Sequence, residues 1–322
     1  MSADREGATL VLGGSGFLGA HVIQAALEAS PARGSGNEVV SAGRREPFVA
    51  SEAVMRPRWM PFDALHAGAA ERLCDDVQPA RVIVCTALST IPECESYPGL
   101  ARALNVELPQ RIARWCASSG ARAILVSTDL VFGAVAPPAL GFDESASTAP
   151  VSESGRSKAR GESEFLASHP GALVVRLPLL FGDSGGRGLG ASDRVLRAVE
   201  RGERVDAFED EWRTPLDVAS AARALIELSF ADARGILHVA GPERVSRYEL
   251  ALRALLSRGL DRDEARAKLA RTTRAAAGMD ALRPADVTLD ARRARAVLRT
   301  PLLGPSEALA REARAGGAKE RA

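Results

Sequence analysis

Three glycines directly after a short apolar stretch place the strongest constraint on how this chain folds. The segment LVLGGSGFLG, residues 10–19, leads from an apolar strand pattern into a helical pattern. Glycines at this spacing allow a tight turn and let the backbone approach a diphosphate, which the N–H groups at the helix N-terminus can bind. The segment therefore predicts a dinucleotide site rather than a tight turn alone. The residues expected to form it are Gly13, Ser15, Gly16, Phe17, Leu18 and Gly19.

The rest of the chain alternates β-branched runs with helical patterns. Apolar runs that read as strands occur at residues 8–13, 38–43, 80–87, 121–128, 172–178 and 235–241. Continuously apolar strands that alternate with helices are typical of a parallel sheet covered on both faces. We therefore predict an α/β protein with a Rossmann-type, doubly wound parallel sheet and a small C-terminal substrate-binding lobe.

The segment after the second predicted strand bears on the choice of cofactor. An acidic residue at this place binds the ribose 2′-hydroxyl of NAD, but here Arg44 and Arg45 follow the strand, while the acid Glu38 precedes it. Guanidinium groups suit a 2′-phosphate through bidentate, charge-assisted hydrogen bonds, unless the two arginines merely form a solvated loop. NADP(H) is therefore favoured, NAD(H) stays open, and Asp63 is a candidate acceptor for the adenine amino group.

The pattern loosens near residue 182, which suggests a division into two lobes. In the second lobe Ser192 is expected to cap a helix, and Ser246 with Glu249 is expected to form a capping box. The polar, glycine-broken tail is expected to fray. The predicted parts are an NADP(H)-binding domain of residues 7–182 with a returning segment 205–240, a substrate lobe of residues 183–204 and 241–305, and a tail of residues 306–322.

Composition excludes several classes of function. The formal net charge is +1, which gives no electrostatic footprint for nucleic acid. No apolar run approaches the roughly 18 residues that suggest a membrane-spanning helix. The four cysteines show no CxxC spacing and no neighbouring histidines, so no metal site is expected and the thiols read as reduced. We expect a cytoplasmic protein with a small-molecule substrate and with no nucleic acid or membrane as partner.

Six segments in order are similar to those of a known family. On these segments, which span about residues 8 to 300, the chain resembles the extended short-chain dehydrogenase/reductases, and most of all the sugar-nucleotide reductases of the dTDP-4-dehydrorhamnose reductase type. The resemblance implies a nucleotide-linked sugar bound in the cleft between the two lobes. The segments are VLGGSGFLG (11–19), VSTDLVFG (126–133), GRSKARGE (155–162), WRTPLDV (212–218), HVAGPERVSRYELA (238–251) and RPADVTLD (283–290).

The resemblance also implies a catalytic set. The family reduces a ketone with a Ser or Thr hydroxyl, a tyrosine acid and a lysine, and Thr128 and Lys158 match the first and the last. The tyrosine belongs four residues before the lysine, one helical turn away, where this chain has Ser154. An aliphatic hydroxyl is a far weaker acid than phenol, whose reference pKa is about 10. Loss of a positioned general acid typically costs on the order of 10²–10⁴ in rate.

Five further residues are candidates for roles near this set. Ala87 follows the third well-marked strand and is expected to line the cofactor site, and Asn105 is expected to order backbone or water there. Asp129 is expected to have a structural role. The alternative is that it partly replaces the missing acid. Arg213 binds a substrate phosphate or forms a surface ion pair, and Arg283 is expected at the substrate pocket.

Two classes of function stay open at this point. The first is an NADP(H)-dependent sugar-nucleotide reductase with an unusual proton source. The second is a catalytically weak or inactive dinucleotide-binding regulatory subunit, for which the regulatory β subunit of methionine adenosyltransferase, which resembles these reductases, is a precedent. Ser154 favours the second class, whereas the segments around Arg213 and Arg283 favour a small-molecule site. The sequence leaves a homodimer open.

Overall fold

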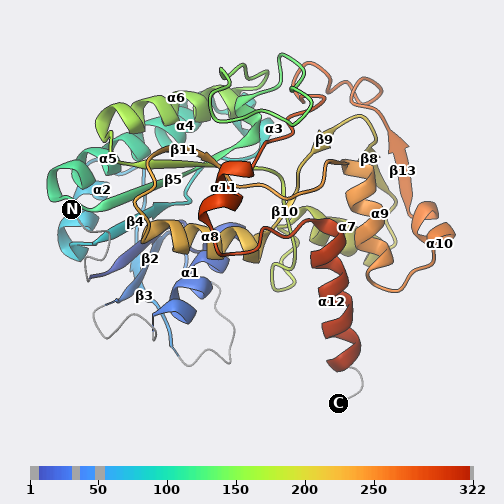
Figure 1. Ribbon diagram of the computed structural model, residues 1–322, viewed down its shortest axis with the longest axis horizontal. Coiled ribbons are helices and arrows are strands. Elements are labelled where there is room, and N and C mark those ends of the chain that lie inside the picture. Colours follow the sequence, from blue (N-terminus) through green and yellow to red (C-terminus); the bar gives the residue numbers. More distant parts are fainter. Residues whose placement is uncertain (1–6, 31–36, 48–54, 320–322) are drawn as a thin grey trace.

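The computed structural model describes residues 7–30, 37–47 and 55–319, and its centre is a seven-stranded sheet (Figure 1). The strand order is β11-β6-β5-β4-β1-β2-β3, and all neighbouring strands are parallel. The order reverses at β1, which opens a crevice for ligands at the carboxyl ends of the strands. The predicted doubly wound α/β sheet is therefore confirmed. The strands are β1 (Thr9–Leu12), β2 (Val39–Gly43), β3 (Arg58–Pro61), β4 (Arg81–Val84), β5 (Arg122–Thr128), β6 (Leu173–Leu177) and β11 (Gly235–His238).

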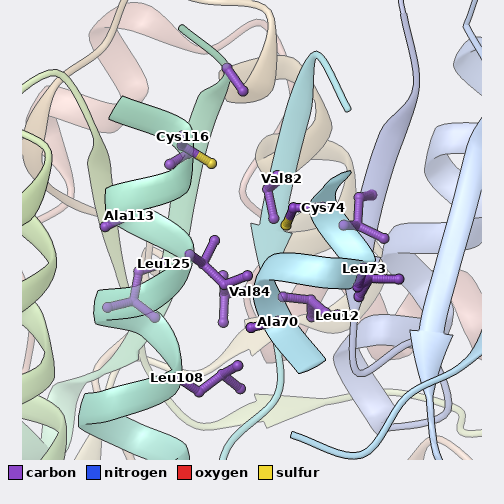
Figure 2. Packing of buried hydrophobic residues seen from close by; sticks show 14 of the residues in the cluster. Leu12, Ala70, Leu73, Cys74, Val82, Val84, Leu108, Ala113, Cys116 and Leu125 are labelled. Carbon is purple, nitrogen blue, oxygen red and sulfur yellow. The ribbon is translucent and has the colours of Figure 1, made fainter. Parts of the chain in front are cut away.

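Helices cover both faces of the sheet because successive strand residues point to opposite sides. Leu10 and Leu12 belong to an apolar cluster with residues of three helices on one face, part of which Figure 2 shows. Val11 belongs to a second cluster on the other face. The helices of the first face are α2 (Ala69–Val77), α5 (Leu108–Ser119) and α6 (Glu153–Ser168), and those of the second are α1 (Phe17–Ala29), α8 (Val218–Ser229) and α11 (Arg292–Val297).

The second lobe lies beside the sheet and consists of short elements (Figure 1). Its core includes Leu196, Ala207, Tyr248 and Leu269. Ala207 lies on β8, which was expected in the returning segment 205–240 of the large domain but pairs with β13 of the second lobe. The elements are α7 (Ala191–Glu200), β8 (Val205–Phe208), β9 (Trp212–Arg213), β12 (Val245–Ser246), α9 (Arg247–Leu256), α10 (Arg262–Ala267) and β13 (Leu269–Thr272), while β7 (Leu180–Phe181) and β10 (Leu216–Asp217) connect the lobes.

Two helix starts in this lobe test the predicted caps. The capping box at α9 is confirmed, because Glu249 N donates to Ser246 Oγ at 3.0 Å and Ser246 N donates to Glu249 Oε2 at 2.8 Å. The prediction for Ser192 is wrong. Gly190 is the N-cap of α7, and the Ser192 hydroxyl instead accepts a hydrogen bond from Gly182 N at 3.0 Å.

The last described residues form a helix, whereas a frayed tail was expected for residues 306–322, of which 320–322 lie outside the described residues. Helix α12 covers Pro305–Lys319, and Ala308 and Leu309 are buried against Phe181 and Leu250. Tertiary burial of these two apolar residues therefore outweighs the glycines further along the tail. No helix in the described ranges is long and apolar enough to pass through a membrane.

Candidate active site

The glycine turn after β1 has the geometry of a phosphate cradle. Gly13 has a φ of +88°, and a Cβ atom there would lie 2.9 Å from the backbone of Thr86. A Cβ at Gly19 would collide with the Gly13 carbonyl oxygen, so the turn needs glycine at both positions. Gly16 is the N-cap of α1 and offers no side-chain acceptor, which leaves the first N–H groups of the helix available to an anion. Ser15 lies in this turn, and Phe17 and Leu18 are the first residues of α1, while their contact with a cofactor stays a prediction.

The other predicted cofactor residues lie at the carboxyl ends of the neighbouring strands. Arg44 and Arg45 follow β2 and are exposed, and Ala87 lies in the segment after β4. Asp63 follows β3, where its carboxylate accepts a hydrogen bond from Leu65 N at 3.0 Å. The fold therefore brings all of these residues to one edge of the sheet, although the role of each toward a cofactor stays a prediction.

A buried asparagine ties the segment after β4 to helix α6. Asn105 lies in the π-helical turn Ala103–Glu107 between α4 (Pro98–Arg102) and α5. Its amide oxygen accepts from Leu88 N at 3.0 Å, and its Nδ2 donates to Leu88 O at 2.9 Å and to Ser157 Oγ at 3.0 Å. Asn105 thus orders the backbone at this edge of the sheet.

Lys158 reaches the last part of β5, the strand that ends at Thr128. Lys158 lies on α6, and its Nζ donates to Val126 O at 3.1 Å, two residues before Thr128. Burial lowers the pKa of Lys158 to about 8, although Cys85 and Glu162 act in the opposite direction. The lysine is therefore a buried cation whose pKa is much closer to neutrality than that of an exposed lysine.

Ser154 occupies the first turn of α6 and is only 2% exposed. Ser154 lies near Cys94 of α3 (Ile91–Ser96). Burial raises the pKa of the Cys94 thiol, and the interaction with Ser154 lowers it in part. The two tyrosines of the chain lie elsewhere: Tyr97 is 61% exposed between α3 and α4, and Tyr248 packs in the core of the second lobe. Ser154 therefore has no tyrosine beside it on α6.

Arg213 is buried, so the expectation of a surface ion pair is wrong, while the expectation of a substrate phosphate stays untested. Its guanidinium donates to Asp129 Oδ1 at 2.8 Å and to Glu211 Oε1 at 3.0 Å. Although burial disfavours the charge, Asp129 and Glu211 together raise the pKa of Arg213. The guanidinium is thus neither a surface ion pair nor positioned as an uncommitted phosphate ligand. Asp129 in turn accepts from Thr128 Oγ1 at 3.1 Å, so this pair also orients the threonine hydroxyl.

Two other arginines, Arg283 and Arg247, act on the same acid, Glu211. Arg283 is partly buried and donates to Glu211 Oε2 at 3.2 Å, with its guanidinium over the ring of Phe208 at 5.2 Å from the centroid. Burial lowers the pKa of Arg247 to about 10, and the positive charges of Arg213, Arg283 and Arg194 contribute, while Glu211 opposes. Three guanidinium groups, those of Arg213, Arg247 and Arg283, therefore lie around the carboxylate of Glu211. Sequence reasoning missed Glu211, Arg194 and Arg247, because nothing in their local sequence marks them.

The fold and the site together define a two-lobed, doubly wound α/β protein with a phosphate cradle at its switch point. The chain belongs to the RmlD substrate binding domain family, which matches residues 7–314. This confirms the family predicted from the six segments.

Three known proteins illustrate the likeness. The chain is 36% identical over 255 residues to dTDP-4-dehydrorhamnose reductase of Mycobacterium tuberculosis, a match that covers 76% of this chain and 74% of that protein. It is 32% identical over 201 residues to methionine adenosyltransferase 2 subunit beta of Xenopus tropicalis, covering 61% and 59% of the two chains. The fold is similar to that of Bacillus anthracis dTDP-4-dehydrorhamnose reductase in complex with NADP, with a TM-score of 0.77, 20% identity and coverage of 95% and 98%.

Proposed function

We propose that this protein reduces the ketone of a nucleotide-linked sugar with a nicotinamide dinucleotide. The observation that carries the proposal is the position of the buried Lys158 against the last part of β5, the strand that ends at Thr128. This strand lies two strands away from the glycine turn that follows β1. The similarity to dTDP-4-dehydrorhamnose reductase supports the reaction class.

The bound cofactor would supply the hydride, and the residues of this chain would hold it in place. The N–H groups at the start of α1 suit its diphosphate, and Lys158 suits the nicotinamide ribose. Arg44 and Arg45 follow β2, where the second ribose lies in folds of this kind, and they favour the extra phosphate of NADP(H) over NAD(H).

The sugar nucleotide carries two negative phosphates, which the arginine cluster of the second lobe can attract. Arg213 is held by Asp129 and Glu211, so its role in this proposal is to position the site. Arg283 and Arg247 are partly buried and lie in a positive environment, which suits them to bind the diphosphate directly. Arg283 thus keeps the substrate role predicted from the sequence.

The chemical difficulty is the proton that the ketone oxygen gains when hydride reaches the carbon. Thr128 can hold this oxygen through its hydroxyl, which Asp129 orients. Ser154 contributes no useful acid because it is an aliphatic alcohol. Burial places the pKa of Lys158 at about 8, so in the proposal its ammonium group gives a proton to the oxygen through water and is then reprotonated from solvent.

A second candidate is a subunit that binds the dinucleotide without turning it over. The observation in its favour is Ser154, where the resemblance places the acid, together with the similarity to methionine adenosyltransferase 2 subunit beta. Under this alternative the glycine turn and Lys158 serve binding alone.

A direct assay separates the two candidates. Purified protein is mixed with NADPH and dTDP-4-dehydrorhamnose, and NADPH oxidation is followed by absorbance, while NADPH affinity is measured by calorimetry. We expect slow turnover that falls by about a hundredfold or more in Thr128→Val, because the hydroxyl contacts the reacting oxygen. NADPH affinity should stay within about twofold in this variant. Tight NADPH binding with no oxidation in the unmodified protein would favour the second candidate.

A further inference from the structure

A loop of the second lobe reaches across to the glycine turn. This crossing loop, residues 182–190, lies between β7 and α7 and has the sequence GDSGGRGLG. Arg187 Nη1 donates to the carbonyl oxygen of Ser15 at 2.8 Å, and His21 Nε2 lies 2.9 Å from Asp183 O. A Cβ at Gly190 would come within 2.7 Å of the Phe17 ring. The loop is thus seated on the turn and on the first part of α1.

Internal hydrogen bonds give the crossing loop a defined shape. Ser184 is buried, and its hydroxyl accepts from Arg187 N at 3.1 Å and from Leu189 N at 3.2 Å while bonding to the carboxylate of Asp193. Asp193 also accepts from Gly188 N at 2.8 Å. Arg187 Nε donates to Ser184 O at 2.8 Å. The backbone therefore holds the Arg187 guanidinium in a fixed place instead of leaving it on a long flexible stem.

The fixed guanidinium adds to a concentration of positive charge. Burial lowers the pKa of Arg187 and the charge of Arg45 lowers it further, while Asp183 and Asp193 act in the opposite direction. Arg45 comes from the end of β2, and Arg187 touches the turn after β1. The two cations thus approach the same edge of the sheet from different lobes. In a doubly wound fold the adenosine ribose of a dinucleotide lies between these two strand ends.

We propose that Arg187 binds the 2′-phosphate of NADP(H) together with Arg45, so that the crossing loop selects this cofactor over NAD(H). The inference rests on the proposed function only in that the glycine turn binds a nicotinamide dinucleotide. It assigns a cofactor role to a segment that the sequence placed in the substrate lobe. The physical reason is that a doubly charged phosphate neutralises cations that otherwise repel one another, and a planar guanidinium can form two hydrogen bonds to it.

Calorimetry on the full chain tests this inference with four probes: NADPH, NADH, adenosine 2′,5′-bisphosphate and adenosine 5′-monophosphate. In Arg187→Ala we expect the affinity for NADPH and for the bisphosphate to fall by about ten- to a hundredfold, which is the range for loss of a hydrogen bond to a charged group. The affinity for NADH and the monophosphate should change by less than about threefold. Arg187→Lys keeps the charge and should lose less than Arg187→Ala.

Arg201→Ala is the matched control, because it removes one exposed arginine of the same lobe that pairs with Glu203. It should leave all four affinities unchanged. An equal loss for NADPH and NADH in Arg187→Ala would assign the residue to the diphosphate and overturn the proposal, as would no loss at all. Discrimination by Arg187 without ketone reduction would refute the proposed reductase while this inference stands. Absence of dinucleotide binding in the unmodified protein would contradict both the proposed function and this inference.

Discussion

At the scale of single residues, the proposed reaction depends most on position 154, where the resemblance places the acid. Ser154 lies one helical turn before Lys158, is only 2% exposed and interacts with the Cys94 thiol, so a phenol ring at this position needs additional space. A buried side chain larger than the site allows costs about 1–3 kcal/mol in folding free energy. Restoring an acid here therefore requires room as well as a hydroxyl.

The double variant Ser154→Tyr with Cys94→Ala should reduce dTDP-4-dehydrorhamnose faster than the unmodified protein, by on the order of 10²-fold, the lower range for a positioned general acid. The phenol would lie one turn from Lys158, whose positive charge lowers a neighbouring phenol pKa. Ser154→Phe with Cys94→Ala is the control of equal size. Steady-state NADPH oxidation is the measurement, and equal rates for the two double variants would show that an acid at position 154 does not limit turnover.

Because of Lys158, the folding stability of the protein should depend on pH. Its pKa is about 8 in the folded protein and 10.5 when unperturbed, so the folded state binds fewer protons between these values. The free energy of unfolding therefore rises as pH increases from about 8 to 10.5, because Lys158 loses its charge in the folded state first. Below this range the buried cation lowers the free energy of unfolding by about 3 kcal/mol.

We expect Lys158→Met to be more stable than the unmodified protein at pH 7, with a difference that shrinks toward pH 10.5. Urea unfolding across this pH range measures it. Arg160→Met, which removes an exposed cation from the same helix, is the control and should show a small, pH-independent change. A difference for Lys158→Met that stayed constant with pH would contradict the depressed pKa.

At the scale of elements, the position of α6 depends on its close contact with the Asn105 turn. A Cβ at Gly161 would collide with the carbonyl oxygen of Asn105. The helix therefore lies close enough to this turn for the Ser157 hydroxyl to accept a hydrogen bond from Asn105, and Lys158 follows directly in the chain. Displacing α6 should move the lysine away from the end of β5.

Gly161→Ala tests this dependence. Alanine normally stabilises a helix interior relative to glycine by about 1 kcal/mol, yet here we expect a loss of about 1–3 kcal/mol because backbone must move. Gly99→Ala is the matched control, since that glycine is also helical and a Cβ atom added there would meet nothing within 4 Å. Thermal unfolding distinguishes the two, and stabilisation by Gly161→Ala would contradict the tight contact.

The elements also show where sequence reasoning succeeds and where it stops. Six strands of the sheet and the glycine turn were predictable because burial on both faces and a φ of +88° at Gly13 leave few sequences that fit. The edge strand β3 was not among the predicted runs, because its residues are exposed or only partly buried. Ser192 was assigned as a cap because serine favours that position, but its hydroxyl bonds to the distant Gly182. One partner of Arg213, Asp129, comes from the other lobe and lies 84 residues away in the chain, so no local pattern reveals this pair.

At the scale of the whole molecule, a buried chain of charges joins the two lobes. Asp129 follows the central strand β5, Arg213 and Glu211 belong to the second lobe, and Arg283 completes the chain. Ion pairs of this kind are costly to break because the remaining charges stay buried. The lobes should therefore be held together most firmly where the proposed site lies.

Arg213→Met should destabilise the protein by about 3–5 kcal/mol, since it leaves Asp129 and part of Glu211 uncompensated. The control is Arg244→Met, which breaks the more exposed pair with Asp286 and should cost less than about 1 kcal/mol. Chemical denaturation measures both. The double variant Arg213→Met with Asp129→Asn should recover part of the loss, and equal instability of the single and double variants would argue against the pair.

The crossing loop bears on the order in which the two ligands bind. Arg187 of the loop is anchored at Ser15, and Arg283 and Arg247 lie further along the same lobe. If the proposals hold, binding of the adenosine end would therefore stabilise the position of the lobe that is proposed to bind the sugar. An enzyme built this way should follow a compulsory order of addition, with the coenzyme entering first and leaving last.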